Sequence, residues 1–98
     1  MLIKVHKSYR DLVAICDKDI LGKKFEEEDR ILEIKEDFYN GEEISYKDLI
    51  QLMVFMYKED ATFNIVGKES IKAAIESGII LEEGIRKVEG IPFALVLL

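Results

Sequence analysis

The residues best suited to chemistry are His6 and Cys16, the only histidine and the only cysteine of the chain. A thiol and an imidazole form a nucleophile and its base when the fold brings them within hydrogen-bond reach and a third group orients the imidazole. A hairpin of two opening strands could bring the pair together, but the sequence indicates no orienting group. The alternation in Leu12-Val13-Ala14-Ile15-Cys16 instead predicts a buried, unreactive thiol. A single cysteine also excludes an internal disulfide and the common zinc spacings.

Two acidic segments offer carboxylate oxygens. Glu26-Glu27-Glu28-Asp29 lacks the alternating acids and the glycine of a calcium loop, so we interpret it as a solvated loop. Asp17 and Asp19 flank Lys18 in a turn-like segment, where a carboxylate usually accepts hydrogen bonds from nearby backbone amides. We therefore expect no catalytic residue, no metal site and no cofactor.

Two glycine-containing segments have part of the pattern of a phosphate site. Leu21-Gly22-Lys23-Lys24 has no Ser or Thr after the lysines and no glycine at the phosphate-loop interval, so it does not support nucleotide binding. Asn64-Ile65-Val66-Gly67 precedes a predicted helix and could present backbone amides to an anion. The simpler interpretation of this segment is a break before the helix.

Charge is distributed unevenly along the chain. The formal net charge is −6, which would repel bulk nucleic acid, but residues 1–24 hold six Lys or Arg and three Asp, a net of +3. If the protein binds RNA, we predict that the basic side chains of this segment, with Tyr9 on its loop, form the contact: Lys4, Lys7, Arg10, Lys18, Lys23 and Lys24. The alternative is an ordinary mixed surface.

The elements that would position these residues form one domain over residues 1–98, because no linker or repeat divides the chain. Patterns of β-prone residues predict three strands before the helices, at 2–5, 11–16 and 30–35, and two after them, at 85–88 and 91–98. Ser45 followed by Asp48 resembles a capping box and predicts a helix that continues to Tyr57. A second helix is predicted over 68–77, with Gly78 as its C-cap.

This order of elements favours an α+β fold: a small antiparallel or mixed sheet with two helices packed on one face, in the order β-β-β-α-α-β-β. The composition, with 13 Glu and 11 Lys but one Gln and one Thr, is typical of a thermophile. Lys4 and His6 interrupt what would be the apolar core of a secretion signal, and no apolar run approaches the roughly 20 residues that cross a bilayer. We therefore expect a cytoplasmic protein that does not contact membranes.

Several short motifs follow one another in an order that is similar to a known family. They are Val13-Ala14-Ile15-Cys16-Asp17, Leu21-Gly22-Lys23 with Phe25, Phe38-Tyr39 with Gly41, Asn64-Ile65-Val66-Gly67, Ala74-Ile75 with Gly78, and Gly90-Ile91-Pro92. Over nearly the whole chain, they resemble the archaeal domain-of-unknown-function family 424 (DUF424). The resemblance implies an intracellular archaeal α+β domain, loosely associated with the translation machinery, with no activity or ligand to transfer. Phe93 stands where that family's pattern has a histidine, so a site built on this histidine would be absent.

The functional prediction is a non-enzymatic intracellular binding module of unknown specificity, associated with RNA, a ribonucleoprotein or the translation machinery. One alternative is a small enzyme or metabolite-binding protein, and a second is a structural homo-oligomer.

Assembly is predicted from an excess of apolar surface, because two helices cover only one face of a sheet. We expect a homodimer through the C-terminal strand, which uses Phe93, Leu95 and Leu97 or the alternate set Ala94, Val96 and Leu98. In the competing interpretation, that strand is central and the opening hairpin curls over its second face.

Overall fold

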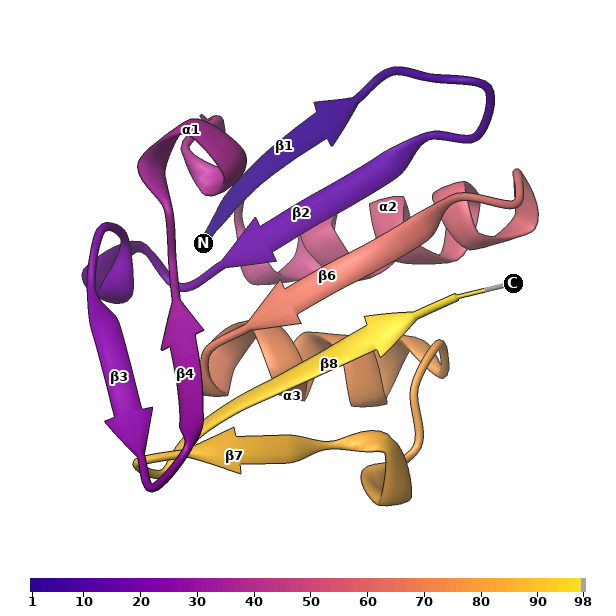
Figure 1. Cartoon of the computed structure of the whole chain (residues 1–98). Helices are drawn as coiled ribbons and strands as arrows, with labels where there is room; N and C mark the ends of the chain where they lie inside the picture. The colour runs from indigo at the N-terminus through magenta and orange to yellow at the C-terminus, as the bar shows by residue number, and fades with distance from the viewer. Residues whose placement is uncertain (98) are drawn as a thin grey trace.

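The computed structural model describes residues 1–97 and has a six-stranded mixed sheet at its centre (Figure 1). The strands lie side by side in the order β5-β1-β2-β6-β8-β7. Their bounds are β1 Leu2–His6, β2 Leu12–Cys16, β5 Glu42–Glu43, β6 Thr62–Val66, β7 Arg86–Val88 and β8 Ile91–Val96. Strands β2 and β6 run parallel, and the other neighbouring pairs are antiparallel. The α+β class and the mixed sheet are therefore confirmed.

Helices α2 (Tyr46–Lys58) and α3 (Lys68–Ser77) pack on one face of this sheet, as predicted. Helix α2 begins where the capping pattern places it, because Ser45 Oγ accepts a hydrogen bond from the Asp48 amide at 3.3 Å. Helix α3 ends at Gly78, whose φ of 85° is the left-handed conformation that favours glycine. Beneath the helices lies the larger core cluster, which includes Leu49 and Phe63.

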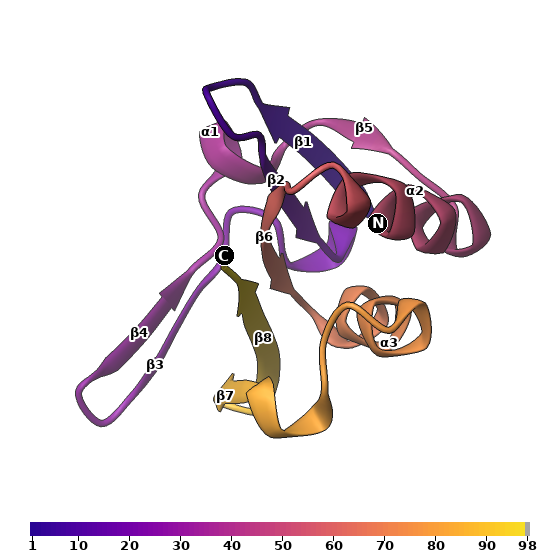
Figure 2. The same cartoon turned by 90° about the vertical axis from the view of Figure 1, so that its right-hand side faces the viewer.

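The opposite face of the sheet is covered over part of its area by the chain itself (Figure 2). The covering elements are the hairpin of β3 (Lys24–Glu27) and β4 (Arg30–Glu33), helix α1 (Glu36–Tyr39) and the 3-10 turn η1 (Lys18–Ile20). A second buried cluster lies under them: Leu2, Ala14, Cys16, Ile20, Ile34, Tyr39 and Val66. The competing interpretation expected the opening β1–β2 hairpin to cover this face. That hairpin instead lies within the sheet.

The predicted break at residues 64–67 is wrong. Thr62–Val66 forms β6, which lies between β2 and β8 at the middle of the sheet, and only Gly67 departs from extended backbone before α3. Asn64 interrupts an otherwise apolar run, and this interruption obscured the short strand. In the structure β6 pairs with β2 on one side and with β8 on the other. Strands β3 and β5 and helix α1 were also missed, because each has no more than four residues.

None of the helices within residues 1–97 is long and apolar enough to cross a membrane. The candidate functional residues lie at the two ends of the parallel strands β2 and β6. The β1–β2 loop lies where these strands begin, and the start of α3 lies where they end.

Candidate functional site

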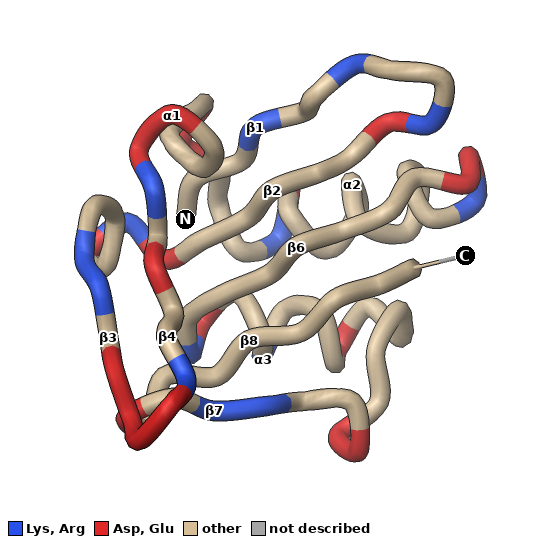
Figure 3. The backbone as a smooth tube through the Cα atoms, in the orientation of Figure 1, with Lys and Arg blue, Asp and Glu red and all other residues tan. Residues whose placement is uncertain are grey.

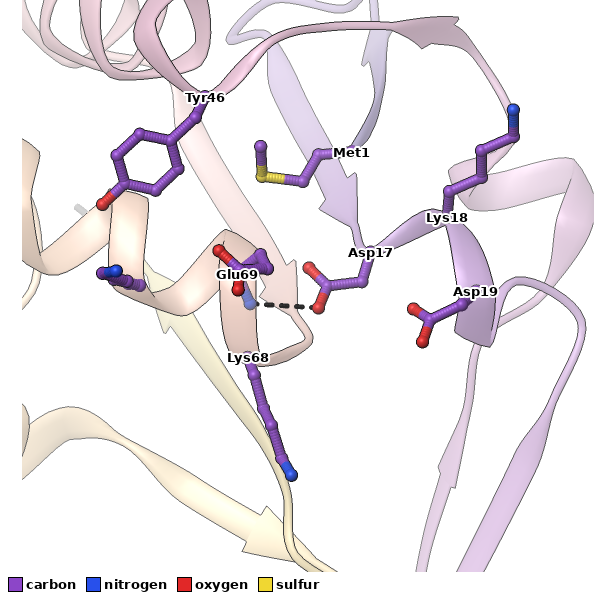
Figure 4. A pocket seen from close by; sticks show the side chains of 8 residues that line it. Met1, Asp17, Lys18, Asp19, Tyr46, Lys68 and Glu69 are labelled. Carbon is purple, nitrogen blue, oxygen red and sulfur yellow. Dashed lines mark hydrogen bonds between the residues drawn. The ribbon is translucent and has the colours of Figure 1, made fainter.

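The carboxyl ends of the parallel strands β2 and β6 meet at Asp17 and Gly67, beside the start of helix α3 (Figure 4). Asp17 turns its carboxylate onto this helix: one oxygen accepts from the Glu69 amide at 3.0 Å, and the other accepts from the Ser70 amide at 2.8 Å. The Ser70 hydroxyl donates to that second oxygen at 2.7 Å. The prediction that Asp17 accepts from backbone amides is confirmed, but the amides belong to a helix that is distant in sequence.

Gly67 makes room for this arrangement. Its φ is 111°, in a region that L side chains rarely adopt, and a Cβ atom at this position would overlap the Asp17 carboxylate. Ser70 has no exposed surface, so its hydroxyl depends on Asp17 as the acceptor. The first amides of α3, which the sequence offered as an anion site, therefore bind a carboxylate of the chain itself.

A hollow of about 630 Å³ lies beside this cap. Its lining carries three lysines and three acids beside an aromatic ring and a thioether: Met1, Asp17, Lys18, Asp19, Tyr46, Lys68, Glu69 and Lys72. The Lys18 and Lys68 side chains extend away from each other in Figure 4, so the two ammonium groups do not converge on one point. This balance of charge does not select an anion or a cation.

The aromatic ring of the hollow belongs to Tyr46, at the first position of α2. Its hydroxyl donates to the Glu76 carboxylate on α3, and the Lys72 ammonium lies 5.8 Å from the ring centre. The hydrogen bond to Glu76 is the main reason that the pKa of Tyr46 rises to about 12. At neutral pH this phenol is therefore a hydrogen-bond donor that ties α2 to α3, and it is not a base.

His6 and Cys16 do not form a catalytic pair. In the β1–β2 ladder, His6 is paired with Leu12 and Cys16 with Leu2, so the two residues lie at opposite ends of the hairpin. The His6 ring stacks on Phe38 with 4.6 Å between the ring centres, and its Nε2 lies 2.8 Å from the Phe38 carbonyl oxygen. Cys16 is fully buried, and burial raises the pKa of its thiol to about 11. The predicted burial of Cys16 is confirmed.

Of the six basic residues predicted for RNA binding, five lie in two separate groups and Lys4 lies on β1, so the six do not form one surface (Figure 3). Lys7 and Arg10 lie on the β1–β2 loop, whereas Lys18, Lys23 and Lys24 follow the other end of β2. Several of these ammonium groups have partners: Lys4 donates to the Asp37 carbonyl, Lys7 lies 3.3 Å from Asp11, Lys18 lies 3.1 Å from Glu43, and Lys24 lies 3.6 Å from Glu26.

The β1–β2 loop carries the most exposed aromatic ring among the described residues. Tyr9 is fully exposed at its tip, between Lys7 and Arg10 in the sequence. The loop is held by the Ser8 hydroxyl, which donates to the Arg10 carbonyl oxygen at 2.6 Å. A ring presented in this way contributes little to the stability of the fold, so it is free to stack on an external group.

The acidic segment Glu26 to Asp29 is not simply a solvated loop, because its first two residues end β3. The hairpin tip bonds to the β7–β8 turn through two side chains: the Glu89 amide donates to Glu27 at 2.8 Å, and the Glu26 amide donates to Glu89 at 2.7 Å. The Glu89 amide and then Arg30 lower the pKa of Glu27. Within residues 1–97, no group of three or more His, Cys, Asp or Glu side chains is arranged to hold a metal ion.

The C-terminal strand contributes both buried and exposed apolar residues. Phe93 packs against the cluster under the β3–β4 hairpin, whereas Leu95 and Leu97 are 57% and 69% exposed. The alternate set is buried where it is described, since Ala94 and Val96 belong to the core under the helices. Leu98, the third member of that set, lies outside the described residues.

Comparison with known proteins identifies relatives of unknown activity. None of the curated proteins matches the chain. The fold is similar to the crystal structure of an uncharacterized conserved protein from Methanopyrus kandleri, with a TM-score of 0.85 and 23% sequence identity over 98% of this chain and 90% of that one. Residues 6–98 match the family model described as a protein of unknown function, DUF424. The chain, whose motifs already resemble that family, therefore belongs to DUF424.

Proposed function

We propose that this protein is a non-enzymatic binding module that contacts single-stranded RNA through its β1–β2 loop. The observation that carries the proposal is the full exposure of Tyr9 between Lys7 and Arg10. Single-stranded RNA is recognised largely by stacking of unpaired bases on aromatic rings, while basic side chains contact the phosphates.

The electrostatics of the chain support a local and weak contact. The net charge of −6 disfavours binding over the whole surface, but the loop belongs to the only segment with a positive balance, residues 1–24. Asp11, Glu59 and Asp60 share a polar hollow with Tyr9 and Arg10. These acids reduce the attraction for phosphate, so we expect a weak contact that needs both stacking on Tyr9 and the charges of Lys7 and Arg10.

The separation of His6 from Cys16 and the use of Asp17 as a helix cap favour binding over catalysis. Neither arrangement leaves a nucleophile beside a base, which covalent catalysis by these side chains would require.

Fluorescence anisotropy with a labelled, mixed-sequence single-stranded RNA tests the proposal. We expect Tyr9→Ala to weaken binding about tenfold, since stacking contributes ~1–3 kcal/mol per base, and Tyr9→Phe to retain it. Phe55→Ala is the matched control, because Phe55 is also an exposed ring but belongs to α2 and not to the loop.

A charge series separates the two basic groups. Lys7→Glu with Arg10→Glu should abolish binding, and Lys47→Glu, at an exposed position on α2, should not. The triple change of Lys7, Arg10 and Lys23 to Glu tests the surface predicted from the sequence. If Lys23→Glu with Lys24→Glu abolishes binding while the loop variants bind normally, or if Tyr9→Ala has no effect, the loop is not the RNA contact.

A further inference from the structure

We propose that a second copy of this chain pairs with the open edge of β8, in a two-fold contact that buries Leu95 and Leu97. The contact shares Glu59 and Asp60 with the hollow beside the β1–β2 loop, but it is argued from the edge of β8 and is tested by mass and not by RNA binding.

The edge is open because β7 is shorter than β8. Strand β7 pairs with Ile91, Pro92 and Phe93, but β8 continues to Val96, and β7 pairs with no described residue of β8 beyond Phe93. In Figure 1 the end of β8 extends past β7 toward the C-terminus. Sheet edges that expose backbone donors and acceptors are templates for strand addition.

The register shows which backbone groups face this open edge. The Gly67 amide donates to the Pro92 carbonyl at 2.9 Å, so the backbone groups of Pro92 point toward β6. Backbone direction alternates along a strand, and the groups of Ala94 and Val96 therefore also point toward β6. The N–H and C=O of Leu95 consequently point away from β6, to the side where β7 has ended.

Apolar side chains surround the exposed backbone of Leu95. A groove of about 490 Å³ runs along residues 94–97 and is bordered by residues 79–81, Glu83, Gly84 and Tyr57. Leu81 is 70% exposed and Tyr57 is 46% exposed, in addition to Leu95 and Leu97. A group of exposed apolar side chains beside an open strand edge is typical of an interaction surface.

A second copy of the chain fits this edge, because antiparallel pairing of two β8 strands brings complementary residues together. With the two-fold axis at Val96, Leu95 of each copy lies opposite Leu97 of the other, and both present their backbone groups to the contact. The β7 strand of the second copy then lies in line with β8, beyond its end, next to the turn that precedes β6.

The position of the second copy's β7 brings together charged side chains of opposite sign that form no ion pair within one copy. Arg86 and Lys87 on β7 are exposed and basic, and Glu59 and Asp60 in the turn before β6 are exposed and acidic. None of these four forms an ion pair within residues 1–97. The two-fold pairing brings the basic pair of each copy beside the acidic pair of the other, so the surface is complementary to itself.

The first test is the mass of the full chain by light scattering over the micromolar range. We expect a mass of twice 11.3 kDa, and a mass of 11.3 kDa at every concentration would overturn the proposal. Leu95→Pro removes an N–H that the isolated copy does not use, and proline is tolerated at strand edges. This variant should unfold in a transition close to that of the wild type but dimerise about tenfold more weakly or not at all, since each lost ~1.4 kcal/mol is a factor of ten.

Side-chain variants test the apolar part of the contact. Leu95→Lys with Leu97→Lys should give a folded monomer. Ile31→Lys is the matched control, because Ile31 is 60% exposed on the β3–β4 hairpin and should leave the dimer intact.

A charge exchange tests the partner itself. Arg86→Glu with Lys87→Glu should give a monomer, and so should Glu59→Lys with Asp60→Asn; asparagine is chosen because position 60 has a φ of 62°. Mixing these two monomeric variants restores opposite charges at both ends of the contact and should restore the doubled mass. A dimer that survives Leu95→Pro and both charge variants uses another surface, and that result would refute the proposal.

Discussion

Removal of the Asp17 carboxylate should destabilise the protein more than removal of any other acid near the start of α3. Asp17→Ala deletes the acceptor of three hydrogen bonds, from the Glu69 amide, the Ser70 amide and the Ser70 hydroxyl. Loss of a helix cap costs ~0.5–2 kcal/mol, and a buried hydroxyl left without a partner costs ~1–3 kcal/mol. Because these costs overlap, we expect the free energy of unfolding to fall by about 2–4 kcal/mol.

Urea unfolding followed by circular dichroism measures this change. Asp17→Asn keeps one acceptor oxygen but loses the interaction of a negative charge with the helix dipole, so it should cost about 1 kcal/mol or slightly more. Asp19→Ala is the control: Asp19 is exposed, accepts no hydrogen bond among the described residues and should change stability by less than ~0.5 kcal/mol.

A double-mutant cycle separates the cap from the hydroxyl. Ser70→Ala should cost ~1 kcal/mol, and adding it to Asp17→Ala should cost less than the sum of the two, because no buried hydroxyl is then left without an acceptor. If Asp17→Ala is as stable as Asp19→Ala, then Asp17 does not act as the cap of α3. If the two changes at positions 17 and 70 are additive, then the Ser70 hydroxyl does not depend on Asp17.

Three further predictions concern a buried thiol, an exposed carboxylate and a glycine that packs closely against the backbone of β1. Burial raises the pKa of the Cys16 thiol to about 11, so at neutral pH Cys16 should react with a thiol reagent only as fast as the protein unfolds. Rapid labelling of the native protein would contradict this. NMR should show that the pKa of Glu27 lies below its ordinary value, and the chemical shift of the Glu89 amide should change over the same pH range. The hydrogen bond from the Glu89 amide to Glu27 is complete while Glu27 is ionised, and it is lost as the pH falls through the lowered pKa. Gly41→Ala should cost about 3 kcal/mol or more, because its Cβ would overlap a backbone carbonyl of β1; Gly84→Ala, with open space around it, should be neutral or slightly stabilising, and equal effects would refute the steric argument.

Helices α2 and α3 and the first hairpin were predictable because their signals are local. Ser45 caps α2 within its own first turn, Gly78 ends α3 by its own backbone conformation, and the opening strands are joined by a short loop. Strand β6 was not predictable in the same way. It pairs with β2 across an intervening hairpin and two helices, so nothing adjacent in sequence marks it as a strand.

The candidate site was predictable only in its parts. The sequence indicated that the Asp17 carboxylate would accept from amides, but the identity of the donor helix depends on the parallel pairing of β2 with β6. The six basic residues gave a positive segment, but β2 separates Lys7 and Arg10 from Lys18, Lys23 and Lys24. The proposal that two-fold pairing sets Arg86 opposite Glu59 could not be made without the register of β8.

The motifs that resemble DUF424 mostly occupy positions that the fold itself requires. The first motif ends at Asp17 and the fourth ends at Gly67, and these residues meet at the cap of α3, where a side chain at position 67 would displace the carboxylate. Gly41 likewise passes against the β1 backbone with no room for a side chain. By contrast, Tyr9 and Leu95, on which the proposed contacts depend, lie outside every one of these motifs. A chain can therefore keep the motifs, and with them the scaffold, while its loop tip and its open strand edge change, so membership of the family transfers the fold but leaves the binding partner to be tested in each protein.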